Sequence, residues 1–90
     1  MKNYKIIFEP KAKDEYEQWK HENKTVVDKI KKLIADIKKT PFKGIGKPEP
    51  LKHELQGYWS RRIDGVHRLV YSVTDDAIII TACKYHYKKN

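Results

Sequence analysis

The chain of 90 residues has a single cysteine, only three arginines and no long apolar run. Because one cysteine cannot form a disulfide within the chain, the fold must be stable without one, which suits a reducing compartment. No segment approaches the ~20 consecutive apolar residues that a membrane span needs, and the first residues lack the pattern of a signal peptide. We therefore expect a cytoplasmic protein that does not associate with a membrane.

Acidic residues are scarce beside basic ones. Twelve Asp and Glu stand against twenty Lys and Arg, which leaves a formal net charge of +8. Eleven Lys and seven acidic residues fall in positions 1–40, and six basic and three acidic residues fall in positions 41–70. The charge is thus spread over the folded body, which we expect to be one domain spanning 1–90. Such a surface attracts polyanions, namely RNA, DNA, an acidic protein partner or an anionic membrane.

The three arginines all lie in one stretch, Leu51–Tyr71, at positions 61, 62 and 68. Arginine presents a planar fork of donors that matches two phosphate oxygens at once, whereas lysine offers a mobile point charge. A chain that takes most of its basic charge from lysine and places every arginine in one segment points to phosphate recognition. The alternative is chance clustering or surface ion pairing.

The hydrophobic pattern predicts an α+β protein, with a small, mostly antiparallel β-sheet and two N-terminal α-helices packed on one of its faces. The clearest signal is the helical spacing of apolar residues from Val26 to Ile37, with lysines on the opposite face. The expected order is β-α-α-β-β-β. Its segments are a strand Tyr4–Phe8, a helix Lys11–His21 after Pro10, a helix capped by Thr25 and ended by Pro41, a loop Phe42–Pro50, a short strand or turn Leu51–Leu55, and strands Tyr58–Ile63, His67–Val73 and Ala77–Tyr85.

Asp64-Gly65 is a strong hairpin signal, and the loop length decides which arginines share a face of the sheet. A two-residue loop would place Arg61 opposite Arg68. A three-residue loop that includes Val66 would place Arg62 opposite Arg68. We favour the second register because it gathers the large apolar side chains on one face, with Ser60, Arg62 and Arg68 on the other. Opposed arginines repel each other unless an anion lies between them.

If that anion is an RNA phosphate, cleavage through the 2′-hydroxyl needs a base, an acid and cations, but no metal. Glu49 or Glu54 can supply the base, and a histidine can supply the acid. The candidate cations are Lys52, Arg62 and Arg68, and the tyrosines available for stacking on bases are Tyr58, Tyr85 and Tyr87.

Each of these candidates has a plainer interpretation. Glu49 is also what a solvated loop carboxylate would look like, and His86 is also an ordinary residue near the chain end. Cys83 and His86 are too few ligands for a zinc site. His21 and His53 lie in polar surroundings and are expected to be exposed. The glycines of the 42–50 loop lack the strand and helix that flank a phosphate-binding loop.

Three runs of residues together resemble the YoeB branch of the RelE/ParE-like toxin superfamily. They are GKPEPLKHELQGYWSRRI at 46–63, HRLVYSVTDD at 67–76 and ACKYHY at 82–87. The resemblance implies the toxin of a type II toxin–antitoxin system with a RelE-like α+β fold. Toxins of this branch are mRNA interferases, nucleases that cleave mRNA in the ribosomal A site and so inhibit translation.

The same resemblance implies roles for individual residues. Glu49 corresponds to the general base, Arg68 to the phosphate-stabilising arginine, His86 to the general acid and Tyr87 to the tyrosine that helps to orient the substrate. Lys52 and Arg62 match supporting cations that bind the substrate. The reaction is attack by the 2′-hydroxyl to give a cyclic phosphate, with no metal and no cofactor.

The resemblance also implies partners. They are mRNA and the 70S ribosome, and a cognate antitoxin of the YefM type, whose disordered C-terminal part folds over the toxin. A homodimer is compatible with the likeness. One departure is the extension Lys88-Lys89-Asn90, which either assists RNA contact or is inert.

Two other functions remain open. A catalytically inactive relative with the same fold would bind RNA or antitoxin only, although the presence of the base, the acid and both arginines argues against it. A DNA-binding regulator has little support, because no helix-turn-helix pattern is present.

Overall fold

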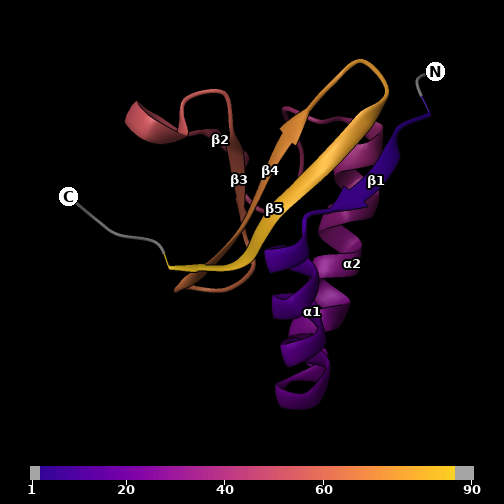
Figure 1. The fold of residues 1–90 in the computed structure, drawn as a ribbon, viewed down its shortest axis with the longest axis vertical. Coiled ribbons are helices and arrows are strands. Elements are labelled where there is room, and N and C mark those ends of the chain that lie inside the picture. Colours follow the sequence, from indigo (N-terminus) through magenta and orange to yellow (C-terminus); the bar gives the residue numbers. More distant parts are fainter. Residues whose placement is uncertain (1–2, 87–90) are drawn as a thin grey trace.

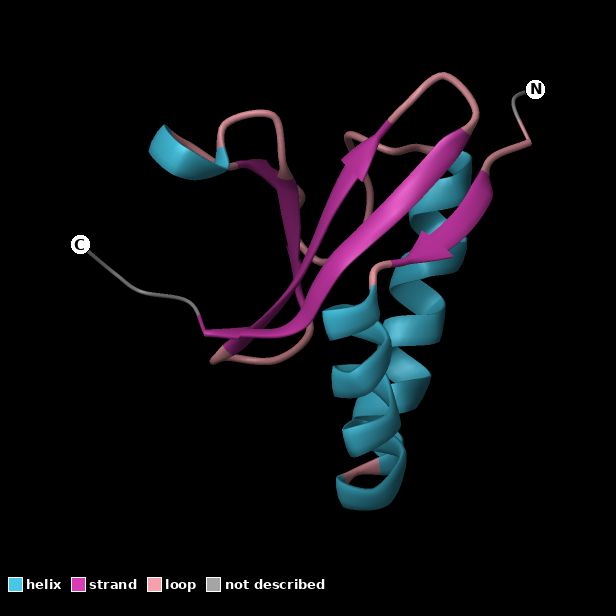
Figure 2. Cartoon of the chain, in the orientation of Figure 1, coloured by secondary structure: helices cyan, strands magenta, loops and turns pink. Residues whose placement is uncertain are grey.

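Two helices form a layer against a twisted five-stranded sheet in the computed structural model, which describes residues 3–86 (Figure 1). Figure 2 shows the same arrangement by secondary structure, with both helices on one side of the strands. The elements are β1 (Lys5–Phe8), α1 (Pro10–Glu22), α2 (Lys24–Lys39), β2 (Glu49–Pro50), a short 3₁₀ helix η1 (His53–Leu55), β3 (Trp59–Arg62), β4 (His67–Val73) and β5 (Ala77–His86).

The strand order is β1-β5-β4-β3-β2. Neighbours are antiparallel except for β1 and β5, which are parallel. That parallel pair joins the first strand to the last, so the intervening chain, including both helices, supplies the long connection that parallel strands require. The predicted α+β fold with a mostly antiparallel sheet is confirmed.

Both helices begin and end close to the predicted positions. Pro10 is the first residue of α1, where its missing N–H costs nothing. The predicted cap of α2 is wrong: Asn23, not Thr25, caps this helix, and its side-chain oxygen accepts from the N–H groups of Thr25 (3.1 Å) and Val26 (3.3 Å). Within residues 3–86, no helix combines the length and apolar content that crossing a membrane requires.

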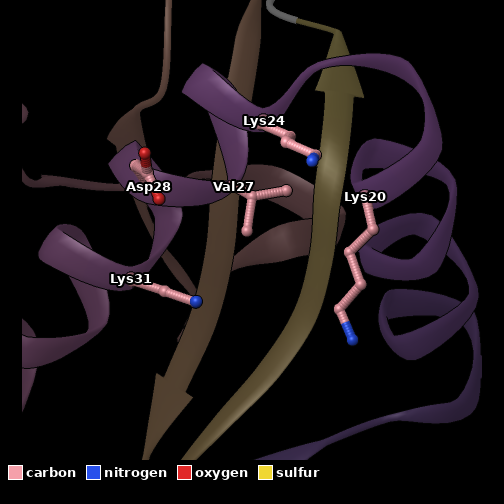
Figure 3. A pocket seen from close by; sticks show the side chains of 5 residues that line it. All are labelled: Lys20, Lys24, Val27, Asp28 and Lys31. Atoms are coloured by element: carbon pink, nitrogen blue, oxygen red, sulfur yellow. The ribbon is translucent and has the colours of Figure 1, made fainter.

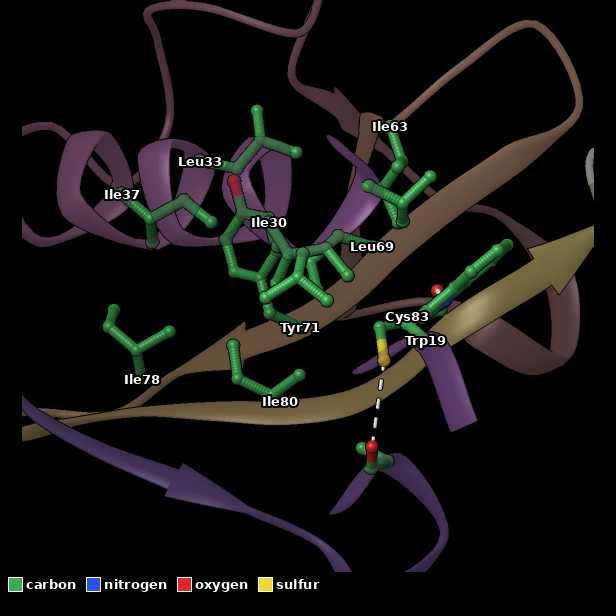
Figure 4. Packing of buried hydrophobic residues seen from close by; sticks show 13 residues of the cluster. Trp19, Ile30, Leu33, Ile37, Ile63, Leu69, Tyr71, Ile78, Ile80 and Cys83 are labelled. Carbon is green, nitrogen blue, oxygen red and sulfur yellow. Dashed lines mark hydrogen bonds between the residues drawn. The ribbon is translucent and has the colours of Figure 1, made fainter. Parts of the chain in front are cut away.

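The core lies between the helices and the inner face of the sheet, that is, the face that α1 and α2 cover (Figure 4). The apolar stripe of α2 supplies Ile30, Leu33 and Ile37, each fully buried, which confirms the amphipathic interpretation of that segment. Burial of one such side chain contributes roughly 1.5–3 kcal/mol. The strands contribute Leu69, Tyr71, Ile78 and Ile80, also fully buried.

The segment from Phe42 to Leu55 differs from the prediction. Its expected loop ends early, because Glu49 and Pro50 form the edge strand β2, with Glu49 opposite Ser60. Proline is tolerated there, since an edge strand leaves one row of N–H positions unused. The following stretch, expected as a short strand or turn, forms a turn, which is the short 3₁₀ helix η1.

The β3–β4 hairpin has the favoured register. Arg62 pairs with Arg68 and Arg61 pairs with Leu69. The N–H of Ile63 donates to the carbonyl of His67 (3.0 Å), which closes the predicted three-residue loop. Because paired residues share a face, Arg61 lies on the inner face and the other two arginines lie on the opposite one.

Candidate active site

The face of the sheet turned away from the helices, here called the outer face, collects three of the candidate residues. Glu49 lies opposite Ser60 in the ladder, and Arg62 follows two residues later on β3, directly opposite Arg68. Residues two apart on a strand share a face. A carboxylate and two guanidinium groups, from three different strands, therefore point to the same side of the sheet.

These three side chains differ in exposure. Glu49 and Arg62 are exposed, but Arg68 is only 4% exposed. One terminal nitrogen of Arg68 donates to the carbonyls of Asp64 (3.0 Å) and His67 (3.2 Å), which supplies acceptors to a charge removed from water. Contact between Arg68 and a substrate phosphate therefore requires the groups that cover it to move.

His86 is placed differently from the other candidates. It pairs with His67 in the β4–β5 ladder, whereas Arg68 pairs with Tyr85. The rings of His67 and His86 lie 5.0 Å apart, nearly perpendicular at 83°. His86 therefore lies at the same end of β4 as Arg68. Its side chain is beside that of His67, on the face of the sheet opposite to the Arg68 side chain.

Two irregularities in the β4–β5 ladder cause this arrangement, and in the first of them one step along β4, from Tyr71 to Val70, spans two along β5, from Ile80 to Ala82. Between the pairs Val70–Ala82 and Arg68–Tyr85, two residues of β4 span three of β5. Such a bulge shifts the alternation of side chains by one position. The two shifts together restore the alternation, so His86 lies on the same face as Ile80 and His67, with its partner in β4 displaced by two positions.

The remaining candidates lie at the borders of this site. Lys52 is exposed and immediately precedes η1, which contains Glu54, also exposed. Tyr58 and Tyr85 are half-buried. Tyr87 and the extension Lys88-Lys89-Asn90 lie outside the described residues, so their roles stay predictions. His21 and His53 are exposed, as expected.

Arg61 has a structural position that the sequence interpretation only partly anticipated. It was expected to face away from the substrate, and it is fully buried. All five N–H groups of its guanidinium have acceptors: the Tyr71 hydroxyl (3.1 Å), Asp36 Oδ2 (2.5 Å), and the carbonyls of Ile45 (3.1 Å), Thr40 (2.7 Å) and Lys43 (2.9 Å). An arginine within an otherwise apolar strand face was the signal that could have revealed this buried network.

The Arg61 network holds the segment that leads to Glu49. Asp36 accepts a second bond from the N–H of Ile45 (3.0 Å), and the Tyr71 hydroxyl donates to the carbonyl of Pro41 (2.7 Å). The hydrogen bond from Arg61 holds the pKa of Asp36 below its ordinary value, and burial raises the pKa of Tyr71. The loop before β2 is therefore fixed to α2 and β4 by hydrogen bonds to buried groups.

Cys83 does not serve the site as a nucleophile. Its side chain is fully buried, with Sγ 3.5 Å from the carbonyl oxygen of Ala12 (Figure 4). Burial raises the pKa of the thiol to about 12, so the reactive thiolate is not populated near neutral pH. Among residues 3–86, no group of three His, Cys, Asp or Glu side chains is arranged to hold a metal ion.

A separate hollow of about 380 Å³ lies where α1 ends and α2 begins (Figure 3). Its lining includes three lysines around one apolar side chain and one carboxylate: Lys20, Lys24, Lys31, Val27 and Asp28. It shares no residue with the candidate active site. Basic side chains therefore gather on the helical layer as well as on the outer face of the sheet.

Comparison with known proteins places the chain in a family. A family model described as "YoeB-like toxin of bacterial type II toxin-antitoxin system" matches residues 8–87. Toxin YoeB of Escherichia coli is 55% identical over 83 residues, which is 92% of this chain and 99% of that protein. Toxin RelK of Mycobacterium tuberculosis is 48% identical over 82 residues, 91% of this chain and 96% of that protein.

Solved structures agree with the sequence comparison. A YoeB dimer from Staphylococcus aureus superposes with a TM-score of 0.89 at 46% identity, covering 94% of this chain and 99% of that one. The toxin in a heterotetrameric YoeB-YefM complex from the same organism gives 0.86 at 47% identity, covering 93% and 98%. The chain therefore belongs to the YoeB-like toxins of bacterial type II toxin–antitoxin systems.

Proposed function

We propose that this protein is a cytoplasmic, ribosome-dependent endoribonuclease that cleaves mRNA in the ribosomal A site without a metal ion and thereby inhibits translation. The observation that carries the proposal is the outer face of the sheet, where Glu49 and the opposed pair Arg62 and Arg68 converge. That arrangement combines a base with cations for a phosphate. The 90 residues act as one domain in this proposal.

The reaction follows from the residue types. Glu49 removes the proton of the 2′-hydroxyl, and the resulting oxyanion attacks the adjacent phosphorus. Arg68, supported by Arg62 and Lys52, stabilises the negative charge on the phosphorane oxygens. His86 then gives a proton to the departing 5′-oxygen, so the products are a 2′,3′-cyclic phosphate and a free 5′-hydroxyl. Tyr87 helps to orient the substrate.

Attack by an internal hydroxyl explains why a metal is unnecessary. The nucleophile is already attached beside the phosphorus, so the protein needs only to place the base, the acid and the cations. Arg62 is exposed, which leaves its guanidinium open to an incoming phosphate. The ribosome supplies the extended mRNA, and the net charge of +8 favours approach to ribosomal RNA.

A protein partner is part of the proposal. Relatives from Staphylococcus aureus form a YoeB-YefM complex and a YoeB dimer. We infer that this chain binds a cognate YefM-like antitoxin and that it can form a homodimer. The basic surface suits an acidic antitoxin segment that covers the toxin and blocks RNA from the arginines.

The second candidate is an inactive relative that binds RNA or antitoxin without cleaving. The near-complete burial of Arg68 is the observation that favours it, since this guanidinium meets a phosphate only after the groups that cover it have moved. The two candidates differ in what happens to the RNA. An inactive relative would leave the mRNA intact at every concentration of protein.

The test is primer extension on mRNA bound to purified ribosomes, with and without the protein. The proposal expects a new 5′ end within the A-site codon that requires the ribosome and persists after EDTA treatment under conditions where the ribosomes stay intact. Intact mRNA would establish the inactive alternative. A specific need for added metal at the cleavage step would refute the metal-free mechanism.

A further inference from the structure

Lys47 has a backbone conformation that its side chain disfavours. Its φ is +50°, in the left-handed region where a side chain crowds the following carbonyl and where glycine is the usual residue. The preceding Gly46 also has a positive φ, of +78°, and a methyl group there would lie 2.7 Å from the Leu33 side chain. Gly46 therefore meets a packing requirement, whereas the next residue is a lysine where glycine would fit with less strain.

Within residues 3–86, no ion pair of the Lys47 side chain offsets this strain. The residue is exposed, and the ion pairs of the described chain all involve other residues. A solvated ammonium group does not stabilise the folded state over the unfolded one. Residues that break a local conformational rule without a structural gain are concentrated at functional sites.

The backbone of Lys47 lies beside two candidate residues of the active site. Lys47 precedes Glu49 by two positions, and the N–H of Arg62 donates to the carbonyl of Gly46 (2.6 Å), the residue before it. The Arg61 network fixes the same segment one residue further back. The lysine side chain therefore extends from a fixed point at the border of the proposed site.

We propose that Lys47 binds a backbone phosphate of the mRNA that adjoins the scissile phosphate. This contact rests on the proposed function, because it is made with the same substrate. In the proposed reaction Arg62 and Arg68 stabilise the scissile phosphate, so a further cation at this border meets the next phosphate of the strand. A mobile ammonium group suits that role, which needs charge and reach rather than the planar fork of arginine.

Stability and substrate binding should change in opposite directions when Lys47 is replaced. Lys47→Gly relieves the strain, so we expect its midpoint of thermal unfolding to rise by roughly 2–6 °C. Lys47→Asn removes the charge but keeps a side chain that tolerates the left-handed region, so its midpoint should not fall. A lower midpoint in Lys47→Gly would show that the lysine serves the fold, and would overturn the proposal.

Binding is measured on ribosomes programmed with an mRNA that cannot be cut, because it has a 2′-deoxynucleotide at the cleavage position. Lys47→Asn and Lys47→Gly should each bind on the order of 10-fold more weakly than the native protein. The logarithm of the association constant should also depend less steeply on the logarithm of the salt concentration, by about 0.7 in slope. Lys43→Gln is the matched control, since Lys43 is an exposed lysine of the same loop whose φ is not positive. An equal loss in that control would overturn the proposal.

A neutral linkage identifies the RNA that Lys47 contacts. Two further mRNAs carry a methylphosphonate, which lacks the phosphate charge, immediately before or immediately after the scissile linkage. With one of the two, the native protein should bind about 10-fold more weakly, whereas Lys47→Asn should lose no further affinity because the contact is already absent. Additive losses with both mRNAs would assign Lys47 to ribosomal RNA and overturn the proposal.

The same measurements distinguish a failure of this contact from a failure of the proposed function. Native protein that binds programmed ribosomes but leaves ordinary mRNA intact would refute the endonuclease, while the methylphosphonate mRNAs would still decide whether Lys47 contacts mRNA. Cleavage of ordinary mRNA, together with additive losses, would refute the role of Lys47 alone. Native protein that does not bind programmed ribosomes would refute both.

Discussion

Arg61 and Asp36 form an ion pair of 2.5 Å across 25 positions of sequence, between the fully buried end of one side chain and a partly buried carboxylate on α2. The pair connects the second helix to the strand that carries the neighbouring Arg62. It also fixes the loop that precedes Glu49, through the bond from the N–H of Ile45 to the same carboxylate. Adjacent arginines thus have opposite roles, one structural and one proposed to bind substrate.

Exchanging each arginine for lysine should separate these roles. Arg61→Lys keeps the charge but loses the planar fork, so several acceptors in a buried site lose their donors, and we expect a loss of about 3 kcal/mol in the free energy of unfolding. Arg62→Lys, at an exposed position, should stay within about 0.5 kcal/mol of the native protein. Urea denaturation measures both. Equal stabilities would contradict the structural role of Arg61.

Gly44 tests how tightly the loop is packed on the Arg61–Asp36 pair. A methyl group built on Gly44 would lie 2.0 Å from Asp36 Oδ2, and the backbone has φ of +125°, which side chains rarely adopt. Gly44→Ala should therefore destabilise the protein by about 2 kcal/mol or more. Gly65→Ala is the matched control, because a methyl group there meets nothing within 4 Å. Thermal unfolding measures both variants, and an equal decrease in their midpoint temperatures would exclude a specific clash at Gly44.

The pH dependence of stability follows from Asp36. Its pKa is lowered in the folded protein, chiefly by the hydrogen bond from Arg61, so the unfolded state binds the proton more readily. The stabilising contribution is present above the ordinary value of 3.8 and disappears as the pH falls through the lower, folded value. Asp36→Asn should be less stable than the native protein at pH 6, with the difference shrinking as the pH approaches 3. A difference in stability that stays constant from pH 6 to pH 3 would contradict this dependence of folding on the protonation of Asp36.

The two candidate bases can be distinguished by paired variants. Glu49→Gln removes the carboxylate that shares the outer face with Arg62, and we expect it to abolish growth arrest when the protein is produced without an antitoxin. Glu54→Gln, at an exposed position in η1, should leave growth arrest unchanged. Circular dichroism confirms that both variants fold. Full toxicity of Glu49→Gln would remove it as the base.

Arg68 is expected to act on the chemical step. Arg68→Ala should slow cleavage under single-turnover conditions by roughly 10²–10³-fold, the usual effect of removing an electrostatic stabiliser. Arg68 also donates hydrogen bonds to two carbonyls of the hairpin loop, so its removal can affect folding. The thermal stability of the Arg68→Ala variant must therefore be compared with that of the native protein. A change confined to ribosome binding would reduce its role to positioning the RNA.

The sequence alone determined the fold class and the hairpin register. The helical spacing of apolar residues in α2 is a local signal that needs no other part of the chain. In the hairpin, only a three-residue loop gathers Trp59, Leu69 and Tyr71 on one face, so the strands themselves select the register. The same alternation correctly separated Arg61 from the other two arginines. Resemblance of three sequence runs identified the family, and the comparisons confirm it.

Tertiary structure alone decided the contacts that join distant segments. Nothing local to Arg61 names Asp36 or the three carbonyl acceptors as its partners, because each comes from another part of the chain. The edge strand at Glu49 exists only because β3 is there to pair with it. Two bulges in the β4–β5 ladder place His86 opposite His67, since each extra residue of β5 shifts by one position the register on which any prediction from sequence relies.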